Sequence, residues 1–204
     1  MSATTGPSTL PRAELRRRRI LSAVLRVVAA GGVDAVTHRR VAAEAEVSLG
    51  STTYHFDTRD DLILDAFRFL IANQTERIAE FESDFAVNDL ESLVEALVAW
   101  SQRELADRVR LVAEYELILR ASRDERLARE YWAWRRSLES LAAERLERFG
   151  IHPAVETARL VVGVIRLHEL EEVAHRPTGP DDLRHWLRLI LEREEWNASM
   201  GGGQ

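Results

Sequence analysis

The chain has 204 residues, enough for one domain with a large core or for a small domain joined to a larger one. It contains no Cys, which excludes disulfides and thiolate chemistry, and no apolar run approaches the roughly 18 residues that a membrane helix needs. The first residues lack the apolar core of a signal peptide, so we expect a soluble cytoplasmic protein without a membrane partner. The net charge of −6 by itself argues against a nucleic-acid partner.

The charge is unevenly distributed along the chain. Residues 1–61 hold nine Arg against seven acidic residues, a balance of +2, whereas residues 62–204 hold nineteen Arg against twenty-seven acidic residues, a balance of −8. A locally basic N-terminal part on an acidic body is compatible with DNA binding by one end of the molecule only.

The N-terminal segment starts with residues 1–11, which are small, polar and twice interrupted by Pro, and we expect them to be disordered. The basic residues Arg12 and Arg16–Arg19 follow, in a helix that is expected to run to about Ala30 and to stop at Gly31-Gly32. A basic run usually forms a solvated helix face. Immediately before a DNA-binding motif, however, it is well placed to contact phosphates.

The stretch Val36–Leu62 predicts two short helices joined by a tight turn, followed by the start of another helix. Thr37 and Ser48 are good N-caps, because a hydroxyl can accept a free backbone N–H at a helix start. The helices are expected over about His38–Ala45 and Leu49–His55. The second helix carries small hydroxyl residues that we expect to be exposed, namely Ser51, Thr52 and Thr53. This pattern indicates a helix-turn-helix, whose second helix enters the major groove of DNA, although a helical hairpin in an ordinary bundle remains an alternative.

Together these pieces resemble the DNA-binding domain of the TetR family of bacterial transcriptional regulators. The resemblance covers roughly residues 13–73, and the remainder of the chain is similar to the family only in its length and all-helical texture. The matching pieces are Val36-Thr37, Ala45-x-Val47-Ser48, Gly50-Ser51-Thr52, Tyr54-His55-Phe56 and Thr58-Arg59-Asp60-Asp61-Leu62.

Three positions depart from the family pattern. Glu46 stands in the turn where the family usually has Gly, and a non-Gly residue at positive φ costs about 1 kcal/mol or more. The turn therefore either has another shape or holds some strain. Thr53 stands where Tyr is common, so one aromatic phosphate contact is expected to be missing, and Arg59 replaces the usual Lys.

The resemblance implies two kinds of contact with a double-stranded DNA operator. The residues expected to hold phosphates or the DNA backbone are Arg16, Arg17, Thr37, Tyr54, His55 and Arg59. The residues expected on the surface nearer the base edges are Arg39, Arg40, Ser48, Leu49, Gly50, Ser51, Thr52 and Thr53.

The rest of the chain predicts six further helices and no strand. Their expected spans are 58–81, 88–106, 109–121, 124–148, 153–175 and 181–195, with Pro153 in the first turn of the eighth helix. Residues 197–204 are Gly-rich and expected to be disordered. The predicted fold is all-α with about nine helices. A three-helix DNA-binding domain over residues 12–57 is joined by the fourth helix to an effector-binding and dimerisation domain over residues 58–196.

The last two helices carry apolar stripes that fit a dimer interface or the chain's own core. In the family that the chain resembles, the corresponding pair forms a four-helix bundle with its twin, so we expect a homodimer that matches a palindromic operator. The expected interface residues are Leu160, Gly163, Val164, Leu167, Leu183, Trp186, Leu187 and Ile190.

The resemblance also implies a small-molecule effector inside the larger domain. The candidate lining residues are Trp100, Tyr115, Trp132, Trp134 and His168, with Glu114 and Arg120 as candidate charges. Core packing is an open alternative for Trp134, since it continues an apolar stripe with Leu127 and Tyr131. Trp132 lies off that stripe, so it is either exposed or faces a different surface.

The expected function is a transcriptional repressor that an effector releases from its operator. An activator of the same fold and a protein–protein adaptor that does not bind DNA remain alternatives. A helical metal enzyme is less favoured, because a di-iron bundle needs two Glu-x-x-His pairs and the chain offers only Glu172-x-x-His175 and the looser Asp182-x-x-His185. We therefore expect no catalysis, no metal and no cofactor.

Overall fold

The computed structural model describes residues 12–85, 87–175 and 179–192, so the two predicted disordered ends, residues 1–11 and 197–204, lie outside it. Within this range every regular element is helical. The elements are α1 (Arg12–Gly31), the 3₁₀ helix η1 (Val33–Ala35), α2 (His38–Glu44), α3 (Leu49–His55), α4 (Arg59–Asp84), α5 (Leu90–Leu105), α6 (Arg108–Ala121), α7 (Glu125–Arg148), α8 (Ala154–Val173) and α9 (Gly179–Leu191). The predicted all-α fold is confirmed.

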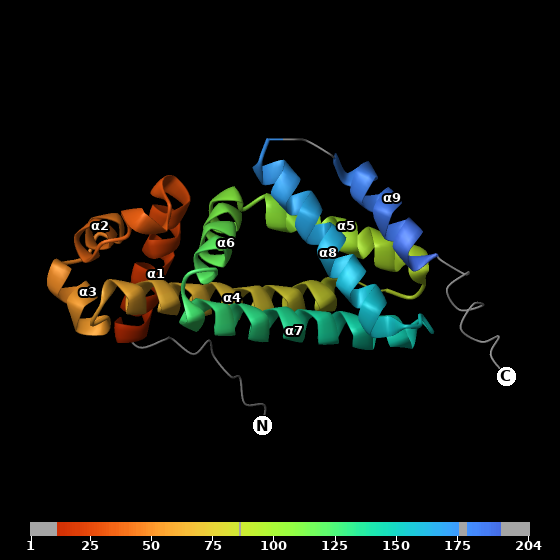
Figure 1. Ribbon diagram of the computed structural model, residues 1–204, viewed down its shortest axis with the longest axis horizontal. Helices are drawn as coiled ribbons and strands as arrows, with labels where there is room; N and C mark the ends of the chain where they lie inside the picture. The colour runs from red at the N-terminus through yellow and green to blue at the C-terminus, as the bar shows by residue number, and fades with distance from the viewer. Residues whose placement is uncertain (1–11, 86, 176–178, 193–204) are drawn as a thin grey trace, which may run out of the picture.

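The three N-terminal helices form a compact head at one end of the molecule, and α8 and α9 lie side by side at the other end (Figure 1). α1 ends at Gly31, and Gly32 follows with φ 74°, a conformation that Gly adopts without steric cost. η1 then leads into α2, whose apolar residues Val41 and Ala42 pack against α1. The 3₁₀ turn has no periodic signal in the sequence and was not predicted.

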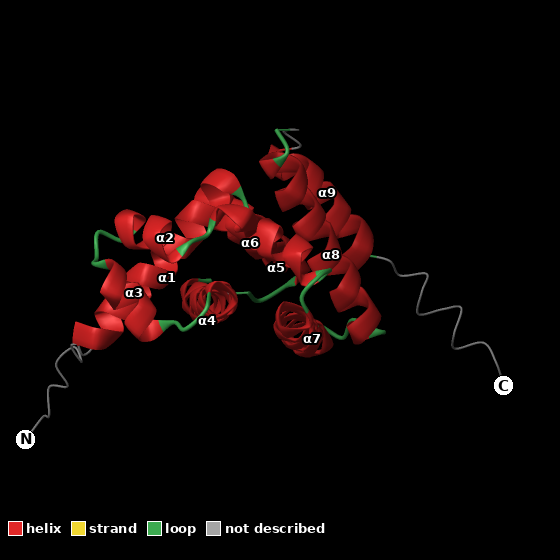
Figure 2. Ribbon diagram, turned by 60° about the vertical axis from the view of Figure 1, so that its left-hand side comes forward, coloured by secondary structure: helices red, strands yellow, loops and turns green. Residues whose placement is uncertain are grey.

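The long helix α4 connects this head to the body. The Thr58 hydroxyl accepts the backbone N–H of Asp61 at 3.1 Å, which confirms Thr58 as the N-cap. α7 packs beside α4, and the two helices run along the long axis of the molecule (Figures 1 and 2). Ion pairs join the two helices, with 2.6 Å between Arg126 and Asp61 and 2.7 Å between Arg68 and Glu130. The two pairs join the first part of α7 to the first part of α4.

The interior contains two clusters of buried apolar residues. The first is built from α1, η1, α2, α4 and the residues that connect them, and it also includes Ala113 and Leu117 of α6 and Leu127 of α7. The second lies between α5, the end of α7, α8 and α9. Because the first cluster combines the head with α6 and α7, the two parts of the chain share a core instead of meeting at a flexible hinge.

Local capping determines where most of the body helices begin. Asp89 caps α5 through the backbone N–H of Ser92 at 2.7 Å, and Asp107 and Asp124 cap α6 and α7 in the same way. Pro153 occupies the N-cap position of α8, one residue before the helical turn in which it was predicted. Among the described helices, none combines the length and the apolar character that crossing a bilayer requires.

Candidate DNA-binding surface and internal cavity

Hydroxyl side chains cap the N-termini of both helices of the helix-turn-helix. The Thr37 side chain accepts the backbone N–H of Arg40 at 3.1 Å, and the Ser48 side chain accepts that of Ser51 at 3.2 Å. Each such cap contributes about 1 kcal/mol to the stability of its helix. Both caps confirm the positions that the sequence indicated for the starts of α2 and α3.

The turn between α2 and α3 holds Glu46 at φ 51°, in the left-handed region that favours Gly. Its backbone N–H donates to the carbonyl of Ala43, and that of Val47 donates to Ala42, so two hydrogen bonds maintain the turn. The Glu46 carboxylate forms an exposed ion pair with Arg19 at 2.5 Å. The turn therefore has the backbone shape that Gly adopts easily, and Glu46 holds the backbone strain of that shape.

The N-terminal part of α3 presents a small, accessible surface. Leu49 is half exposed, and a Cβ added to Gly50 would meet no heavy atom closer than the Ser48 hydroxyl at 4.0 Å. The hydroxyls of Ser48 and Ser51 lie 3.0 Å apart, and Thr53, further along the helix, is exposed. Tyr54 is 84% exposed, more than the exposed apolar side chains Leu15 and Leu49 of the head. A duplex can therefore approach this face closely.

Thr52 corrects one sequence-based prediction. Its side chain is completely buried, and its hydroxyl donates to the carbonyl of Leu49 at 2.8 Å. Thr52 lies one helical turn before the buried Phe56, so these two side chains mark the inner side of the short helix. We therefore no longer expect a base contact from Thr52.

Two side chains that were predicted to contact phosphates bind other groups of the protein itself. The Arg59 guanidinium donates to the carbonyls of Val36 and Val33 at 2.9 and 2.8 Å and to Asp34 at 3.2 Å. Arg17 pairs with Asp65 at 2.9 Å. Arg59 therefore anchors the loop before α2, and any contact it makes with DNA would share these partners.

Other cations of the head are exposed. Arg16, Arg39 and Arg40 lie at the surface, and within the described residues no ion pair engages them. His55 is half-buried beside Tyr54, with 5.2 Å between the two ring centroids. Because an unpaired surface cation gains most from a nearby phosphate, these three arginines are the best placed to meet a polyanion.

The body contains an internal cavity of about 670 Å³ between α4, α5, α7 and α8. This volume lies in the range of roughly 300–1,000 Å³ that is typical of small-molecule sites. Apolar and aromatic side chains form most of the wall, among them Phe81, Trp100, Trp134, Leu138 and Phe149. The polar side chains Gln74, Arg166 and Glu169 line one part of it, and Asn88, Arg145 and Arg148 also belong to the lining.

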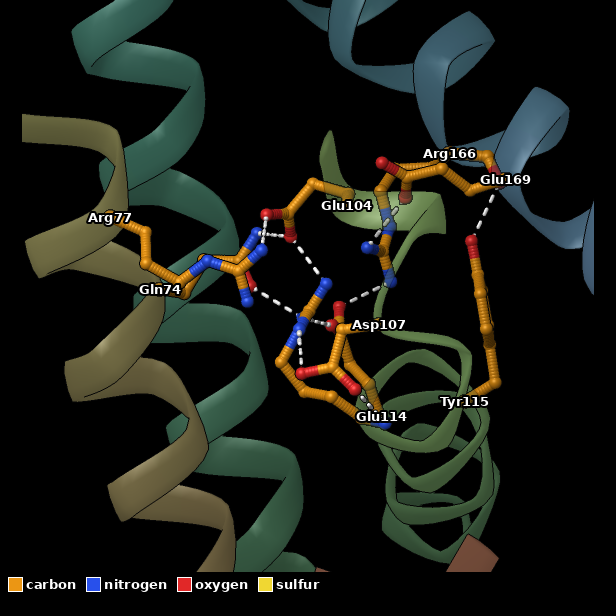
Figure 3. Close-up of polar contacts among 9 residues, drawn as sticks. Gln74, Arg77, Glu104, Asp107, Glu114, Tyr115, Arg166 and Glu169 are labelled. Atoms are coloured by element: carbon orange, nitrogen blue, oxygen red, sulfur yellow. Dashed lines mark hydrogen bonds and ion pairs between the residues drawn. The ribbon is translucent and has the colours of Figure 1, made fainter. Parts of the chain in front are cut away.

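Gln74, Arg166 and Glu169 belong to a chain of buried polar and charged groups that links α4, α5, α6 and α8 (Figure 3). Glu104 is fully buried, and its carboxylate lies 2.5 Å from both Arg77 and Arg110. The Gln74 amide nitrogen donates to Glu104 at 2.9 Å, and its oxygen accepts from Arg110 at 2.9 Å. The network therefore fixes α4 against the end of α5 and the start of α6.

The same chain continues from α6 to α8. Glu114 is fully buried between Arg110 at 2.9 Å and Arg166 at 2.5 Å, and Arg166 also pairs with Glu169 at 3.0 Å. The Tyr115 hydroxyl donates to the Arg166 carbonyl at 2.7 Å. Three guanidinium groups thus alternate with three carboxylates, so the buried charges balance.

Burial changes the acidity of these carboxyl groups. Burial raises the pKa of Glu169 to about 7, although the neighbouring Arg166 opposes the change. Burial also raises the pKa of Glu104, against the attraction of Arg110 and Arg77. Near neutral pH, Glu169 can therefore exchange a proton while it stays inside the protein.

Only some of the five predicted ligand-binding residues line the cavity. Trp100 and Trp134 line the cavity. Trp132 is 57% exposed and packs on Tyr131, so it does not line the cavity. Tyr115 and His168 are outside the lining as well. The Tyr115 hydroxyl bonds to the backbone of α8 at Arg166. His168 is buried, and desolvation lowers the pKa of its imidazole. These three expectations are corrected: Tyr115 lies on α6, which contributes no lining residue, and Trp132 and His168 lie on α7 and α8 at positions outside the lining.

The predicted dimer residues also divide into two groups. Leu160 and Leu167 of α8 and Trp186 of α9 are each 54% exposed, and a Cβ added to Gly163 would meet nothing within 4 Å. Val164 and Ile190 are half-buried. Leu183 and Leu187 correct the prediction, because they are buried in the chain's own core against α5. The exposed members lie on α8 and α9, which are adjacent helices at the end opposite the head (Figure 1).

The sequence reasoning missed most of the buried charge network. It named Glu114 as a candidate charge, but not Gln74, Arg77, Arg110 or Glu169. One local signal was available: Arg110 and Glu114 lie four residues apart on an otherwise apolar helix face. In the described part of the chain, His, Asp and Glu nowhere form a cluster of three or more that could hold a metal ion.

The fold and the head place this chain in the class of helix-turn-helix proteins that bind DNA. Comparison with known families agrees. The tetracyclin repressor-like C-terminal domain matches residues 88–193, and the bacterial regulatory proteins of the tetR family match residues 20–66. The chain belongs to the TetR family of transcriptional regulators.

Several individual proteins are similar to it. A TetR-family member from Streptomyces coelicolor A3 is 33% identical, with a TM-score of 0.67 over 88% of this chain and 98% of that one. The multidrug binding protein EbrR, solved in complex with proflavin, is 34% identical, with a TM-score of 0.60 over 86% and 99%. The HTH-type transcriptional regulator PksA of Bacillus subtilis strain 168 is 36% identical over 77 residues, and the match spans only 36% of its length.

Proposed function

We propose that this regulator is a homodimeric repressor that binds a palindromic DNA operator and is released from it by a small molecule in the body cavity. The observation that carries the proposal is the combination of an accessible recognition helix with a mostly apolar cavity in one molecule. Helices α4 and α7 contribute both to the apolar cluster that holds the head and to the wall of the cavity, so these two helices connect the two features.

At the head, we assign base-edge contacts to the exposed N-terminal part of α3, in particular Ser51 and Leu49. Arg39 and Arg40 lie nearer the bases on the preceding helix, whereas Tyr54 and Arg16 position the protein on phosphates. These contacts would make binding both sequence-dependent and sensitive to salt.

Dimerisation through α8 and α9 would place one recognition helix on each half-site. The apolar face of Leu160, Leu167 and Trp186 supports this arrangement, since exposed apolar faces of this kind mark interaction surfaces. A dimer reads two half-sites about one helical turn apart, roughly 34–36 Å, so the head separation determines affinity.

The effector is proposed to act by moving α4 relative to its neighbours. Gln74 of α4 and Arg166 of α8 both line the cavity and both belong to the buried charge network. A ligand that displaces either side chain shifts α4, and α4 leads directly to the head. The similarity to EbrR, a multidrug binding protein solved with proflavin, supports a small-molecule ligand for this chain.

Fluorescence anisotropy tests DNA binding. The full chain is titrated against the duplex upstream of its own gene and against a scrambled duplex, across a salt series. We expect tight binding to the native duplex that weakens as salt rises. No binding to either duplex at low salt would contradict the proposal, and equal weak binding to both would contradict the choice of operator.

Labels on the two recognition helices of the dimer test the mechanism. Energy transfer between them should change when an effector is added. An unchanged distance, with DNA released, would reject a mechanism based on head separation.

A further inference from the structure

The cavity in the body is elongated along α4 and α7. These two helices run in the same direction (Figure 1), since ion pairs join the first part of one to the first part of the other. Along α4 the lining extends from Gln74 to the C-cap residue Phe85, which is about 16 Å of helix. Along α7 it extends from Trp134 to Arg148. The cavity therefore has two ends, and their side chains differ.

The inner end, which lies toward the head, is formed by Gln74, Trp134, Arg166 and Glu169. Gln74, Trp134 and Glu169 are all buried, and the Arg166 guanidinium carbon lies 5.7 Å from the centroid of the Trp134 ring. Arg166 pairs with Glu169 at 3.0 Å and with Glu114 at 2.5 Å. The charges at the inner end are therefore matched within the protein.

The outer end, which lies away from the head, is formed by Phe85, Asn88, Arg145 and Arg148. Phe85, Asn88 and Arg148 are exposed, so the cavity meets solvent here. Neither an ion pair nor a hydrogen bond joins the Arg148 guanidinium to any residue that the structure describes. Arg145, three residues earlier on α7, places a second guanidinium in the same part of the lining. The outer end thus presents positive charge to whatever enters.

The charge of the cavity wall is opposite in sign to that of the body around it. Residues 62–204 have a balance of −8. The ionisable residues of the lining are three Arg and one Glu, a balance of +2, namely Arg145, Arg148, Arg166 and Glu169. Because Arg166 and Glu169 pair with each other, the excess positive charge lies at the outer end. A concave surface lined by charge of one sign concentrates ligands of the opposite sign.

We infer that the cavity takes an amphipathic anion, whose apolar body occupies the cavity and whose carboxylate binds Arg148 at the outer end. This inference rests on the proposed role of the cavity as the effector site. The wall between the two ends is apolar and aromatic, with Phe81, Trp100 and Leu138 among its residues, so it holds hydrocarbon. A carboxylate at the exposed end keeps part of its hydration, and it therefore gains a guanidinium partner without the cost of full burial.

Three ten-carbon compounds test the inferred charge of the ligand. Decanoate is the anion, decan-1-ol is neutral and decylammonium is the cation, and each is titrated by calorimetry into the full chain without DNA at pH 7. We expect decanoate to bind about three- to tenfold more tightly than decan-1-ol, because the arginines at the outer end are only partly shielded from water. Decylammonium should bind more weakly than decan-1-ol.

Substitution of single arginines on α7 assigns the preference to one side chain. Arg148→Gln should abolish the preference for decanoate over decan-1-ol and leave the affinity for decan-1-ol unchanged. Arg136→Gln is the matched control, because Arg136 is exposed on the same helix but lies outside the cavity lining. Both variants lose one positive charge, so only a local contact distinguishes them. The two ligands and the two variants form double-mutant cycles.

Brominated ligands test the orientation of the ligand in the cavity, since bromine quenches Trp fluorescence on contact. 10-Bromodecanoate has its bromine at the end of the chain, and 2-bromodecanoate has it beside the carboxylate. At equal occupancy the first should quench more strongly, because Trp134 lines the inner end. Trp134→Phe should reduce this difference, whereas Trp132→Phe, outside the lining, should not. Equal quenching or the reverse order would contradict a carboxylate at the outer end.

The remaining outcomes separate this inference from the proposed function. No binding of decanoate, equal affinity for decanoate and decan-1-ol, tightest binding of decylammonium, or a preference that survives Arg148→Gln would each overturn the inference. DNA binding is measured separately by anisotropy. A chain that binds its operator but fails the ligand tests refutes the inference alone, whereas a chain that binds decanoate as expected but binds no DNA refutes the proposed function alone.

Discussion

The head and the body of this protein use arginine in opposite ways. In the head, Arg16, Arg39 and Arg40 lie at the surface without a partner in the described residues. In the body, Arg110 and Arg166 are enclosed between carboxylates that are themselves fully or almost fully buried. A surface arginine can be lost with little effect on folding but with a cost in DNA binding, whereas a buried one is tied to its partners. The predictions below test this contrast, beginning with the largest expected effect.

Removal of Glu114 should damage the body most. Glu114→Ala leaves two buried guanidinium groups without their shared carboxylate, and breaking a buried pair in this way typically costs about 3–5 kcal/mol. Urea unfolding measures the loss. The control Glu125→Ala removes a side chain that is 97% exposed and should change stability by less than about 0.5 kcal/mol. Similar losses in the two variants would show that the network does not behave as a buried unit.

Glu169 should make the stability depend on pH. Its pKa is about 7 in the folded protein against an ordinary value of 4.5, so the folded state holds the proton more tightly. The contribution is present at low pH and is lost as pH rises through about 7, and its full size is up to roughly 3 kcal/mol.

Glu169→Gln tests this dependence, because the amide does not titrate. The free energy of unfolding, measured from pH 5 to pH 8, should fall less steeply in the variant than in the wild type. The groups that face Glu169 and remain in both proteins are Arg166, Glu114, Glu104 and Arg110. Parallel curves for the two proteins would be inconsistent with a raised pKa at this residue.

Substitution of two neighbouring hydroxyl residues of α3 should have different effects, one on DNA recognition and the other on folding stability. Ser51→Ala is expected to relax the preference at particular base pairs by roughly 1–3 kcal/mol if a base contact is lost. Thr52→Ala should lower stability instead, because its buried hydroxyl bonds to Leu49, and should leave the relative preference for different duplexes unchanged. Anisotropy on a set of operator variants decides, and a changed preference in the Thr52 variant would restore that residue to the base contacts.

Tyr54 should affect affinity without affecting preference. Tyr54→Ala removes an exposed ring that is proposed to contact phosphates, and we expect about tenfold weaker binding to operator and scrambled duplexes alike. Trp132→Ala removes an equally large exposed aromatic ring from α7 and should leave DNA binding unchanged. A loss confined to the operator would place Tyr54 at the bases.

The smallest effect is expected at the turn. Glu46→Gly relieves a backbone held at φ 51° and should raise stability by about 1 kcal/mol, since the exposed pair with Arg19 contributes little. Glu46→Ala keeps the strained conformation but also removes the pair, so it is the matched control. Equal thermal midpoints for the two variants would show that the turn is not strained.

The sequence by itself determined the local features of this protein. The caps at Thr37, Ser48, Thr58 and Asp124 are where the sequence predicts them, because a cap depends on residues two to four positions away. The TetR-like head followed from one continuous stretch for the same reason. Periodicity also indicated the long body helices, whose apolar faces repeat every three or four residues.

Only the tertiary structure decided which of several similar side chains face one another. Trp132 and Trp134 are two residues apart, yet one is exposed and the other lines the cavity. Leu183 and Leu187 have the same periodic signal as an interface stripe but pack inside the chain. Arg166 pairs with Glu114, although the two residues are 52 positions apart in the sequence. Such contacts depend on how whole helices cross, which no local pattern in the sequence encodes.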